Sequence, residues 1–269
     1  MNLLEKILEA KKESLAQRKK TLPLATILAQ SRGVKNPVSL RVAVNVEGEL
    51  SIIAEMKKKS PSAGGILKSY DPPRIAGAFE SAGARGISVL TEENFFDGSP
   101  EHLEQVRKAS KLPILRKDFI FDPYQIYETK VLGASCVLLT LAILEPSLFL
   151  ELMDLSREIH LDALVEVHDE TELDRALKAG ADMVGVNNRN LKDLTVNLET
   201  TFRLRRLIPE GICVVSESGI AGTATISRLR RSWIQAALIG ESILKSSNIE
   251  NKLRAFVKAG MSSPEAEMN

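Results

Sequence analysis

The sequence predicts an α/β fold, a closed (β/α)8 barrel that follows an N-terminal helical extension. From about residue 51, short and continuously apolar runs alternate with longer segments of helical periodicity. Unbroken apolar strands are typical of a parallel sheet buried on both faces, and strand–helix alternation favours parallel strands joined by right-handed crossovers. The alternative, an open doubly wound sheet, would need a glycine-rich dinucleotide turn after the first strand, and the sequence has none.

Eight short apolar runs are the expected strands of the barrel. They lie at Ser51–Ala54, Gly86–Leu90, Pro113–Leu115, Cys136–Leu139, Ala163–Val167, Met183–Val186, Ile212–Val215 and Ala236–Ile239. Helical patterns lie between them at Pro72–Ala82, Pro123–Leu132, Pro146–Ile159, Thr171–Ala179 and Leu198–Leu207. Three of these helices begin with proline, which the first turn tolerates because its N–H groups have no helical partner.

The first 50 residues precede the barrel pattern. Leu4, Ile7, Leu8 and Leu15 mark the apolar face of an amphipathic helix, with lysine and glutamate opposite. This helix could either plug the floor of the barrel or lie across its mouth. We expect residues 1–269 to form one barrel domain, with residues 1–50 as its extension and residues 262–269 as a disordered tail.

Composition limits the classes of partner. With 44% apolar residues, the 269-residue chain can bury a large core. Its 36 Lys and Arg nearly balance 35 Asp and Glu, so the net charge of +1 gives no reason to expect nucleic acid or an anionic membrane as partner. No run approaches the ~18 apolar residues of a membrane span, and the start lacks the apolar segment of a signal peptide. We therefore expect a soluble, cytoplasmic protein.

Charged residues follow the predicted strands where the mouth of a barrel collects functional groups. Glu55 and Lys57 follow the first strand, Lys117 follows the third, and Glu166 lies in the fifth. A carboxylate within an apolar run needs a partner or a function. Desolvation and mutual proximity would shift the pKa values of such a group, which suits acid–base chemistry.

The opposite side of the mouth suits a phosphate. Gly219 and Gly240 follow the seventh and eighth strands, whose loops are the usual phosphate site of this fold. Glycine lets a backbone N–H approach an anion, although both residues could also be ordinary turn glycines. Three scattered histidines and two cysteines, Cys136 and Cys213, within apolar runs predict no metal site. We expect His168 to reach only the rim and Trp233 to pack near the eighth strand.

Seven sequence blocks together resemble the indole-3-glycerol-phosphate synthase family. They are IIAEMKKKSPSAG, SVLTEENFFDGS, ILRKDFIFDPYQI, LVEVHDETEL, VGVNNRNL, VSESGI and LIGESIL. The likeness runs to about residue 245 in the family's order and spacing. It implies a TIM-barrel carboxy-lyase of tryptophan biosynthesis that uses no metal or organic cofactor. The expected reaction converts 1-(o-carboxyphenylamino)-1-deoxyribulose 5-phosphate to indole-3-glycerol phosphate, CO2 and water.

The resemblance also implies roles for the four charged residues at the mouth. Lys117 is the expected general acid that protonates the C2 carbonyl oxygen as the aromatic ring carbon attacks it. Glu166 takes part in proton transfer during ring closure and dehydration. Lys57 holds the substrate carboxylate and acts as an acid in dehydration. Glu55 positions Lys57 and takes part in the final deprotonation.

The remaining expected site residues hold the substrate. Asn187 and Arg189 help to hold it, and Ser218 lies next to its reacting part. The residues expected to bind phosphate are Ser60, Gly219, Gly240 and the N–H of Glu241, whose carboxylate must then point away. The residues expected to line the anthranilate pocket are Phe96 and Phe119.

Two other functions are compatible with a phosphate-binding barrel. One is phosphoribosylanthranilate isomerase, whose reaction is expected to use a Cys and an Asp as acid and base. Here Cys136 and Cys213 lie within strands rather than at the mouth. A barrel that only binds ligands would be expected to have lost Lys117 or Glu166, and both are present.

Overall fold

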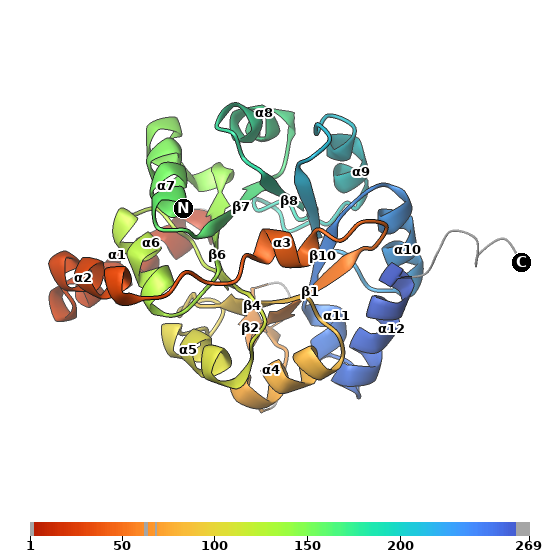
Figure 1. Cartoon of the computed structure of the whole chain (residues 1–269), viewed down its shortest axis with the longest axis horizontal. Helices are drawn as coiled ribbons and strands as arrows, with labels where there is room; N and C mark the ends of the chain where they lie inside the picture. Colours follow the sequence, from red (N-terminus) through yellow and green to blue (C-terminus); the bar gives the residue numbers. More distant parts are fainter. Residues whose placement is uncertain (1–2, 62–63, 68, 262–269) are drawn as a thin grey trace, which may run out of the picture.

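The structure is a computed structural model that describes residues 3–61, 64–67 and 69–261. Eight parallel strands close into a barrel in the order β1-β10-β9-β8-β7-β6-β5-β4, and helices surround it (Figure 1). The strands are β1 (Ser51–Met56), β4 (Gly86–Leu90), β5 (Ile114–Lys117), β6 (Cys136–Thr140), β7 (Asp162–Val167), β8 (Met183–Asn187), β9 (Cys213–Glu217) and β10 (Ala236–Ile239). The predicted fold class is confirmed, and each predicted run overlaps one strand.

Helices follow the strands around the outside. They are α4 (Pro72–Ser81), α5 (Pro100–Ala109), α6 (Pro123–Val131), α7 (Pro146–Glu158), α8 (Glu170–Lys178), α9 (Glu199–Arg205), α10 (Thr223–Arg231), α11 (Glu241–Leu244) and α12 (Ile249–Met261), with a 3-10 turn, η1 (Leu141–Ile143). Asp71, Asp122 and Asp169 cap α4, α6 and α8 by accepting hydrogen bonds from backbone N–H groups of the first turn. A short hairpin of β2 (Lys59–Ser60) and β3 (Gly64–Gly65) follows β1.

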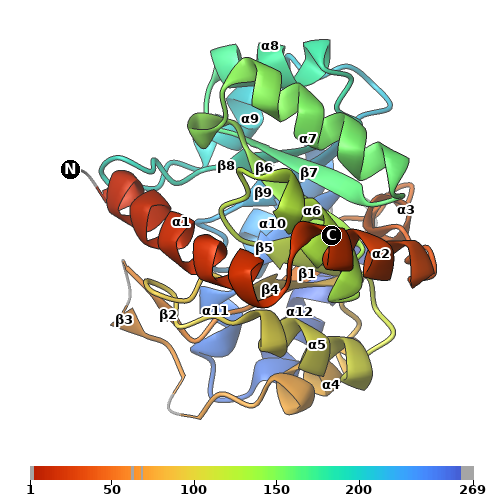
Figure 2. The same cartoon turned by 90° about the vertical axis from the view of Figure 1, so that its left-hand side faces the viewer.

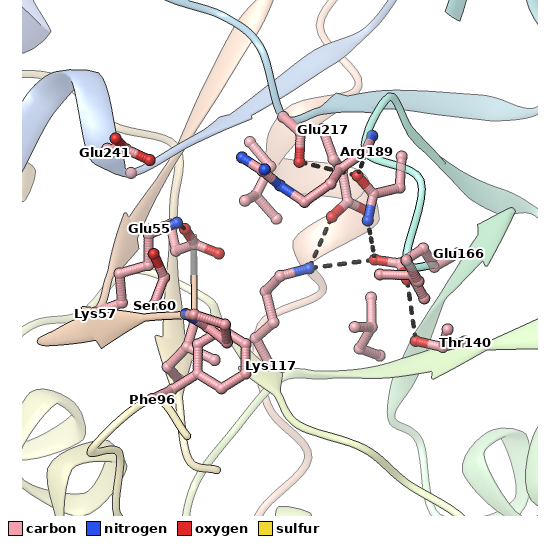
Figure 3. A pocket seen from close by; sticks show the side chains of 18 of the residues that line it. Glu55, Lys57, Ser60, Phe96, Lys117, Thr140, Glu166, Arg189, Glu217 and Glu241 are labelled. Carbon is pink, nitrogen blue, oxygen red and sulfur yellow. Dashed lines mark hydrogen bonds and ion pairs between the residues drawn. The ribbon is translucent and has the colours of Figure 1, made fainter. Parts of the chain in front are cut away.

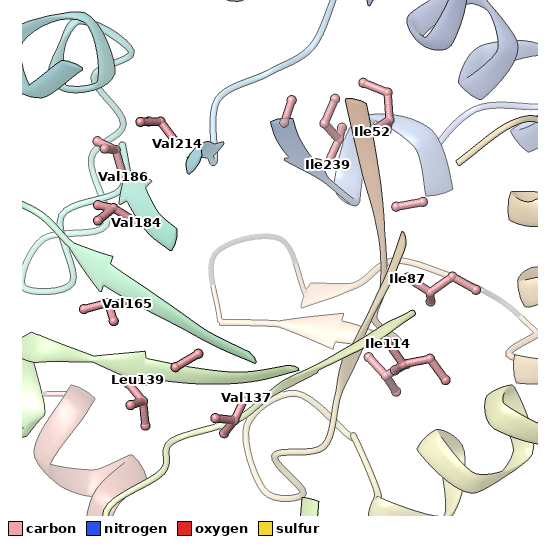
Figure 4. Close-up of a cluster of buried hydrophobic side chains, with 14 of the residues drawn as sticks. Ile52, Ile87, Ile114, Val137, Leu139, Val165, Val184, Val186, Val214 and Ile239 are labelled. Carbon is pink, nitrogen blue, oxygen red and sulfur yellow. The ribbon is translucent and has the colours of Figure 1, made fainter. Parts of the chain in front are cut away.

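The pleat of the strands separates two cores. Outward side chains pack against the helices and form the larger cluster, including Ile52, Val165 and Val214 (Figure 4). Inward side chains, such as Ile53 and Leu115, fill the barrel. Because side chains alternate along a strand, the last inward position of each strand opens at the mouth.

A short helix closes the floor of the barrel. Leu40 and Val44 of α3 (Leu40–Val44) pack into the inner cluster, and α3 lies over the barrel opening in Figure 1. Asp162, at the start of β7, accepts hydrogen bonds from Ser39 Oγ and the N–H of Arg41. The floor plug is therefore α3, and the plug interpretation of the first helix is wrong.

The first helix, α1 (Leu3–Thr21), lies at the opposite end. Its first turns reach the pocket at the carboxyl ends of the strands, and Figure 2 shows the helix lying along the outside of the sheet. Ile7, Lys11 and Leu15 are its buried residues. The burial of Lys11 corrects the expectation that the lysines of α1 lie opposite its apolar face. A second helix, α2 (Leu24–Gly33), packs on α6.

Two other expectations concern the surface. Trp233 is 74% exposed, so the expected packing near β10 is wrong. Its φ of 58° places it in the turn that leads into the strand and leaves the indole outside the barrel. Cys136 and Cys213 are buried free thiols, as expected. Residues 262–269, the expected disordered tail, lie outside the described residues. In the described part of the chain, no helix is long and apolar enough to cross a membrane.

Candidate active site

A pocket opens at the carboxyl ends of the strands, and every residue that the sequence assigned to the site lines it. These residues are Glu55, Lys57, Ser60, Phe96, Lys117, Phe119, Glu166, Asn187, Arg189, Ser218, Gly219, Gly240 and Glu241. The first turns of α1 add Leu3, Leu4 and Ile7. The pocket is therefore apolar on the α1 side and charged at its base.

Lys117 occupies the centre of the base of the pocket (Figure 3). Its Nζ lies 2.8 Å from Oε2 of Glu217 and 3.3 Å from Oε2 of Glu166. Burial alone would lower the pKa of this lysine, but Glu217, Glu166 and Glu55 together raise it above its ordinary value. Lys117 is therefore a charged acid with two carboxylate partners.

Glu166 is held in place on three sides. It accepts hydrogen bonds from Thr140 Oγ1, at 3.2 Å, and from Asn187 Nδ2, at 3.2 Å, in addition to Lys117. Burial favours its neutral form, but the cationic Lys117 and His168 outweigh this and lower its pKa. Glu166 is therefore the ionised carboxylate of the pair.

Glu217 is a site residue that sequence reasoning did not assign. Burial raises the pKa of Glu217 to about 7, and the nearby Glu166 and Glu55 act in the same direction, while Lys117 opposes them. A Cβ at Gly185 on β8 would lie 2.3 Å from Glu217 Oε1, so that glycine makes room for the carboxylate. Strand periodicity could have identified Glu217 as a pocket residue. It lies two residues beyond Val215, which points into the barrel, so its side chain lies on the same inward face.

Glu55 and Lys57 form an ion pair on the other side of the pocket. Glu55 is buried at the end of β1, and Lys57 is the first residue after that strand. A Cβ at Gly240 would lie 2.5 Å from Glu55 Oε2. Gly240 is therefore required for the packing of this carboxylate, whatever its contact with an anion.

The phosphate side is formed by the loops after β9 and β10. Ser218 and Gly219 both have left-handed backbone conformations, with φ of 64° and 80°. Ser218 Oγ donates a hydrogen bond to Asn187 Oδ1 at 2.9 Å, which fixes the turn. The Glu241 carboxylate pairs with Lys245 Nζ at 2.7 Å, one helical turn along α11. The positive charge of Lys245 therefore offsets the negative charge of Glu241, which lies beside the expected anion site.

The aromatic side contains Phe96 and Phe119, whose ring centroids are 6.5 Å apart. Glu92, buried at the end of β4, accepts the backbone N–H of Phe96 at 3.1 Å and shapes that loop. On the opposite wall, Arg189 donates through its guanidinium to the carbonyl of Leu194.

His168 reaches further than the sequence indicated. Its Nε2 lies 3.7 Å from Glu166 Oε1, and its Nδ1 lies 3.0 Å from Glu172 Oε2 on α8. Burial would lower the pKa of this imidazole, but the hydrogen bond to Glu172 and the charges of Glu166, Glu172 and Glu217 raise it. The surroundings of His168 therefore favour its imidazolium form, next to Glu166.

No three His, Cys, Asp or Glu side chains gather as metal ligands among the described residues. The prediction that the reaction needs no metal or organic cofactor remains to be tested by experiment.

Comparison with known proteins decides the family. Residues 4–256 match the profile described as indole-3-glycerol phosphate synthase. The chain belongs to the indole-3-glycerol phosphate synthase family. The indole-3-glycerol phosphate synthase of Dehalococcoides mccartyi (strain CBDB1) is 44% identical over 259 residues, covering 95% of this chain and 100% of the relative. That of Chlorobium phaeovibrioides (strain DSM 265 / 1930) is 43% identical over 252 residues, covering 93% and 98%.

Solved structures of other barrels share the fold alone. Thiamine phosphate pyrophosphorylase from Pyrococcus furiosus matches with a TM-score of 0.61 at 16% identity, covering 82% of this chain and 97% of that chain. The 3-hexulose-6-phosphate synthase from Salmonella typhimurium matches with a TM-score of 0.64 at 12% identity, covering 78% and 98%. Membership of the synthase family, a group of carboxy-lyases, therefore rests on sequence, and the architecture agrees with it.

Proposed function

We propose that this chain converts 1-(o-carboxyphenylamino)-1-deoxyribulose 5-phosphate to indole-3-glycerol phosphate, CO2 and water, with Lys117 as the general acid of ring closure. The observation that carries this assignment is the position of Lys117 Nζ between Glu166 and Glu217 at the base of the pocket. A cationic acid there can stabilise charge that develops on a carbonyl oxygen.

Ring closure and decarboxylation take place at this lysine. The ring carbon that bears the carboxylate attacks C2 of the ribulose, and the carbonyl oxygen takes a proton from Lys117. The bond to the carboxylate then breaks, its electron pair restores the aromatic ring, and CO2 leaves. Glu166, which already accepts a hydrogen bond from Lys117, takes part in the proton transfer.

Dehydration completes the indole at the Glu55–Lys57 pair. The new hydroxyl leaves as water with a proton from Lys57, and Glu55 takes part in removing the proton from C1. The ion pair between the two side chains supports this division, because it holds the acid and the base side by side. Before the reaction, Lys57 holds the substrate carboxylate.

The rest of the pocket holds the substrate. The phosphate is proposed to bind Ser60 and the backbone at Gly219, Gly240 and Glu241, because glycine lets a backbone N–H approach an anion closely. Phe96 and Phe119 receive the anthranilate ring, and Asn187, Arg189 and Ser218 hold the chain between them. From the composition, we also propose that the chain acts in the cytoplasm and binds neither nucleic acid nor membrane.

Turnover of the named substrate tests the proposal. We expect the purified chain to produce the fluorescence of the indole product in the presence of EDTA. The Lys117→Ala chain, purified in the same way, controls for a contaminating host enzyme. Activity that is lost in EDTA and restored by a metal would overturn the cofactor prediction. A folded chain without turnover under any condition would overturn the proposed reaction.

A further inference from the structure

A buried ionic network lies behind the catalytic end of β5. Lys11 Nζ lies 2.8 Å from Asp118 Oδ2 and 3.0 Å from Glu93 Oε2. The side chains of Lys11 and Asp118 are both 0% exposed. Asp118 Oδ2 also accepts from Arg116 at 3.1 Å and from Thr91 Oγ1 at 2.7 Å. The network therefore joins α1 to the segment that follows β5, 107 residues further along the chain.

Stability alone is a weak reason for this arrangement. Lysine is rarely fully buried, and apolar replacements of buried ion pairs are often neutral or stabilising. The cations Lys11 and Arg116 hold the pKa of Asp118 at about 2, against the effect of burial. Asp118 is thus a permanent anion, and its Oδ2 accepts from the lysine of α1 as well as from Arg116 and Thr91.

The neighbours of Asp118 give the network its connection to the pocket. Lys117 precedes it and lines the pocket, as does Asp118 itself. The Asp118 carboxylate accepts from Arg116, and both side chains are fully buried. Phe119 follows it, lines the pocket and donates its N–H to Asp118 Oδ1 at 2.9 Å. The carboxylate therefore lies between two residues that line the pocket.

On α1, Lys11 lies one turn beyond Ile7 on the same buried face. Ile7 lines the pocket, as do Leu3 and Leu4. Lys11 therefore belongs to the helix that covers the pocket and contacts Asp118 in the Lys117–Phe119 segment.

We propose that Lys11 is a positioning residue, whose ammonium sets both the position of α1 over the pocket and the direction of the Lys117–Phe119 segment. This role rests on the proposed function, because it acts through the general acid Lys117. It also defines where the N-terminal extension is attached to the catalytic machinery.

The test compares two lysines of α1. Lys11→Met keeps the length and apolar stem of the side chain and removes its charge. Lys19→Met is the matched control, because Lys19 also joins α1 to the barrel through an ion pair, at 2.5 Å to Asp122, but is 39% exposed. We expect Lys11→Met to lower kcat/KM on the order of 10- to 100-fold, as for other small displacements of reacting groups. Lys19→Met should stay within about twofold, as expected for loss of a partly exposed ion pair.

A double-mutant cycle with Asp118→Asn tests the route. If Lys11 acts through Asp118, the losses of the two single variants are not additive in the double variant. Lys11→Gln, which keeps an N–H donor for Asp118, is the second variant in case the methionine variant does not fold. Circular dichroism establishes folding for each chain.

Hydrogen exchange of residues 3–21 gives a readout that does not depend on turnover. We expect faster exchange in the folded Lys11 variant than in wild type and in Lys19→Met. Unchanged kcat/KM in a folded Lys11 variant, equal losses in Lys11→Met and Lys19→Met, or unchanged exchange of α1 would each overturn the inference. A wild-type chain without turnover overturns the proposed function instead, and the exchange comparison still tests the anchor.

Discussion

Lys117 Nζ lies 2.8 Å from Glu217 Oε2, and this carboxylate has a pKa raised by burial to about 7. The two groups come from β5 and β9, 100 residues apart in the chain. Glu166 lies 3.3 Å from the same Nζ, and its lowered pKa keeps it ionised. Lys117 therefore contacts one carboxylate that stays charged, Glu166, and one that titrates near neutral pH, Glu217.

Replacement of the lysine should remove catalysis and leave the fold intact. We expect Lys117→Ala to lower kcat by ~10²–10⁴-fold, the usual contribution of general acid catalysis. Lys178→Ala is the control, because Lys178 pairs with Asp174 on an exposed face of α8. Steady-state kinetics and circular dichroism decide the outcome. A loss below about tenfold in a folded chain would remove Lys117 from the acid role.

Replacement of Glu217 should have opposite effects on activity and on stability. The pKa of Glu217 is raised in the folded state, so wild type loses stability as pH rises from about 4.5 to about 7. Glu217→Gln carries no such charge, and we expect its melting temperature to exceed that of wild type at pH 8 but not at pH 5. Turnover should fall at least about tenfold, because Lys117 loses a partner.

The control for this comparison is Glu250→Gln, which removes a surface carboxylate paired with Arg254. We expect no pH-dependent difference in its melting temperature beyond that of wild type. A Glu217→Gln chain that is less stable than wild type at pH 8 would show that the ion pair with Lys117 outweighs the burial of the carboxylate.

His168 should contribute stability that is lost at high pH. Its folded-state pKa is raised, so its contribution is present below about 6.5 and disappears as pH rises through the folded value. We expect His168→Asn to cost on the order of 1 kcal/mol at pH 6, a shift of about 2–4 °C in melting temperature, and less at pH 9. Melting curves at both pH values test this, and an equal loss at the two would contradict a role for the imidazolium.

Gly240 should tolerate no side chain. A Cβ there would lie 2.5 Å from Glu55 Oε2 and 3.1 Å from the Glu55 carbonyl oxygen, so Glu55 would have to move. We expect Gly240→Ala to lower kcat/KM by about tenfold or more, and to weaken inhibition by inorganic phosphate. Gly222→Ala is the control, because nothing lies within 4 Å of a Cβ at that glycine. Similar kinetics for the two variants would mean that Glu55 adapts and is not held by close packing.

The sequence by itself determined the architecture and most of the charged residues of the pocket, although not Glu217. Apolar runs such as that of β7 predicted strands because a barrel strand is buried on both faces. The rule that functional groups follow the carboxyl ends of strands then placed Lys117 and Glu166 at one mouth. Glu166 was identifiable because a carboxylate is costly inside an apolar run.

Only the tertiary structure decided which neighbours meet. The stretch Ser216–Ser218 contains three polar residues, and the inward direction of Glu217 depends on the pleat and register of β9 between β8 and β10. The amphipathic pattern of α1 is equally compatible with either end of the barrel, and α3 occupies the floor. Lys11 belongs to a buried pair because its partner Asp118 lies 107 residues away in the chain. Periodicity in a sequence predicts which face of an element is buried. The charged residues that this face contacts come from a segment far away in the chain, so only the tertiary structure identifies them.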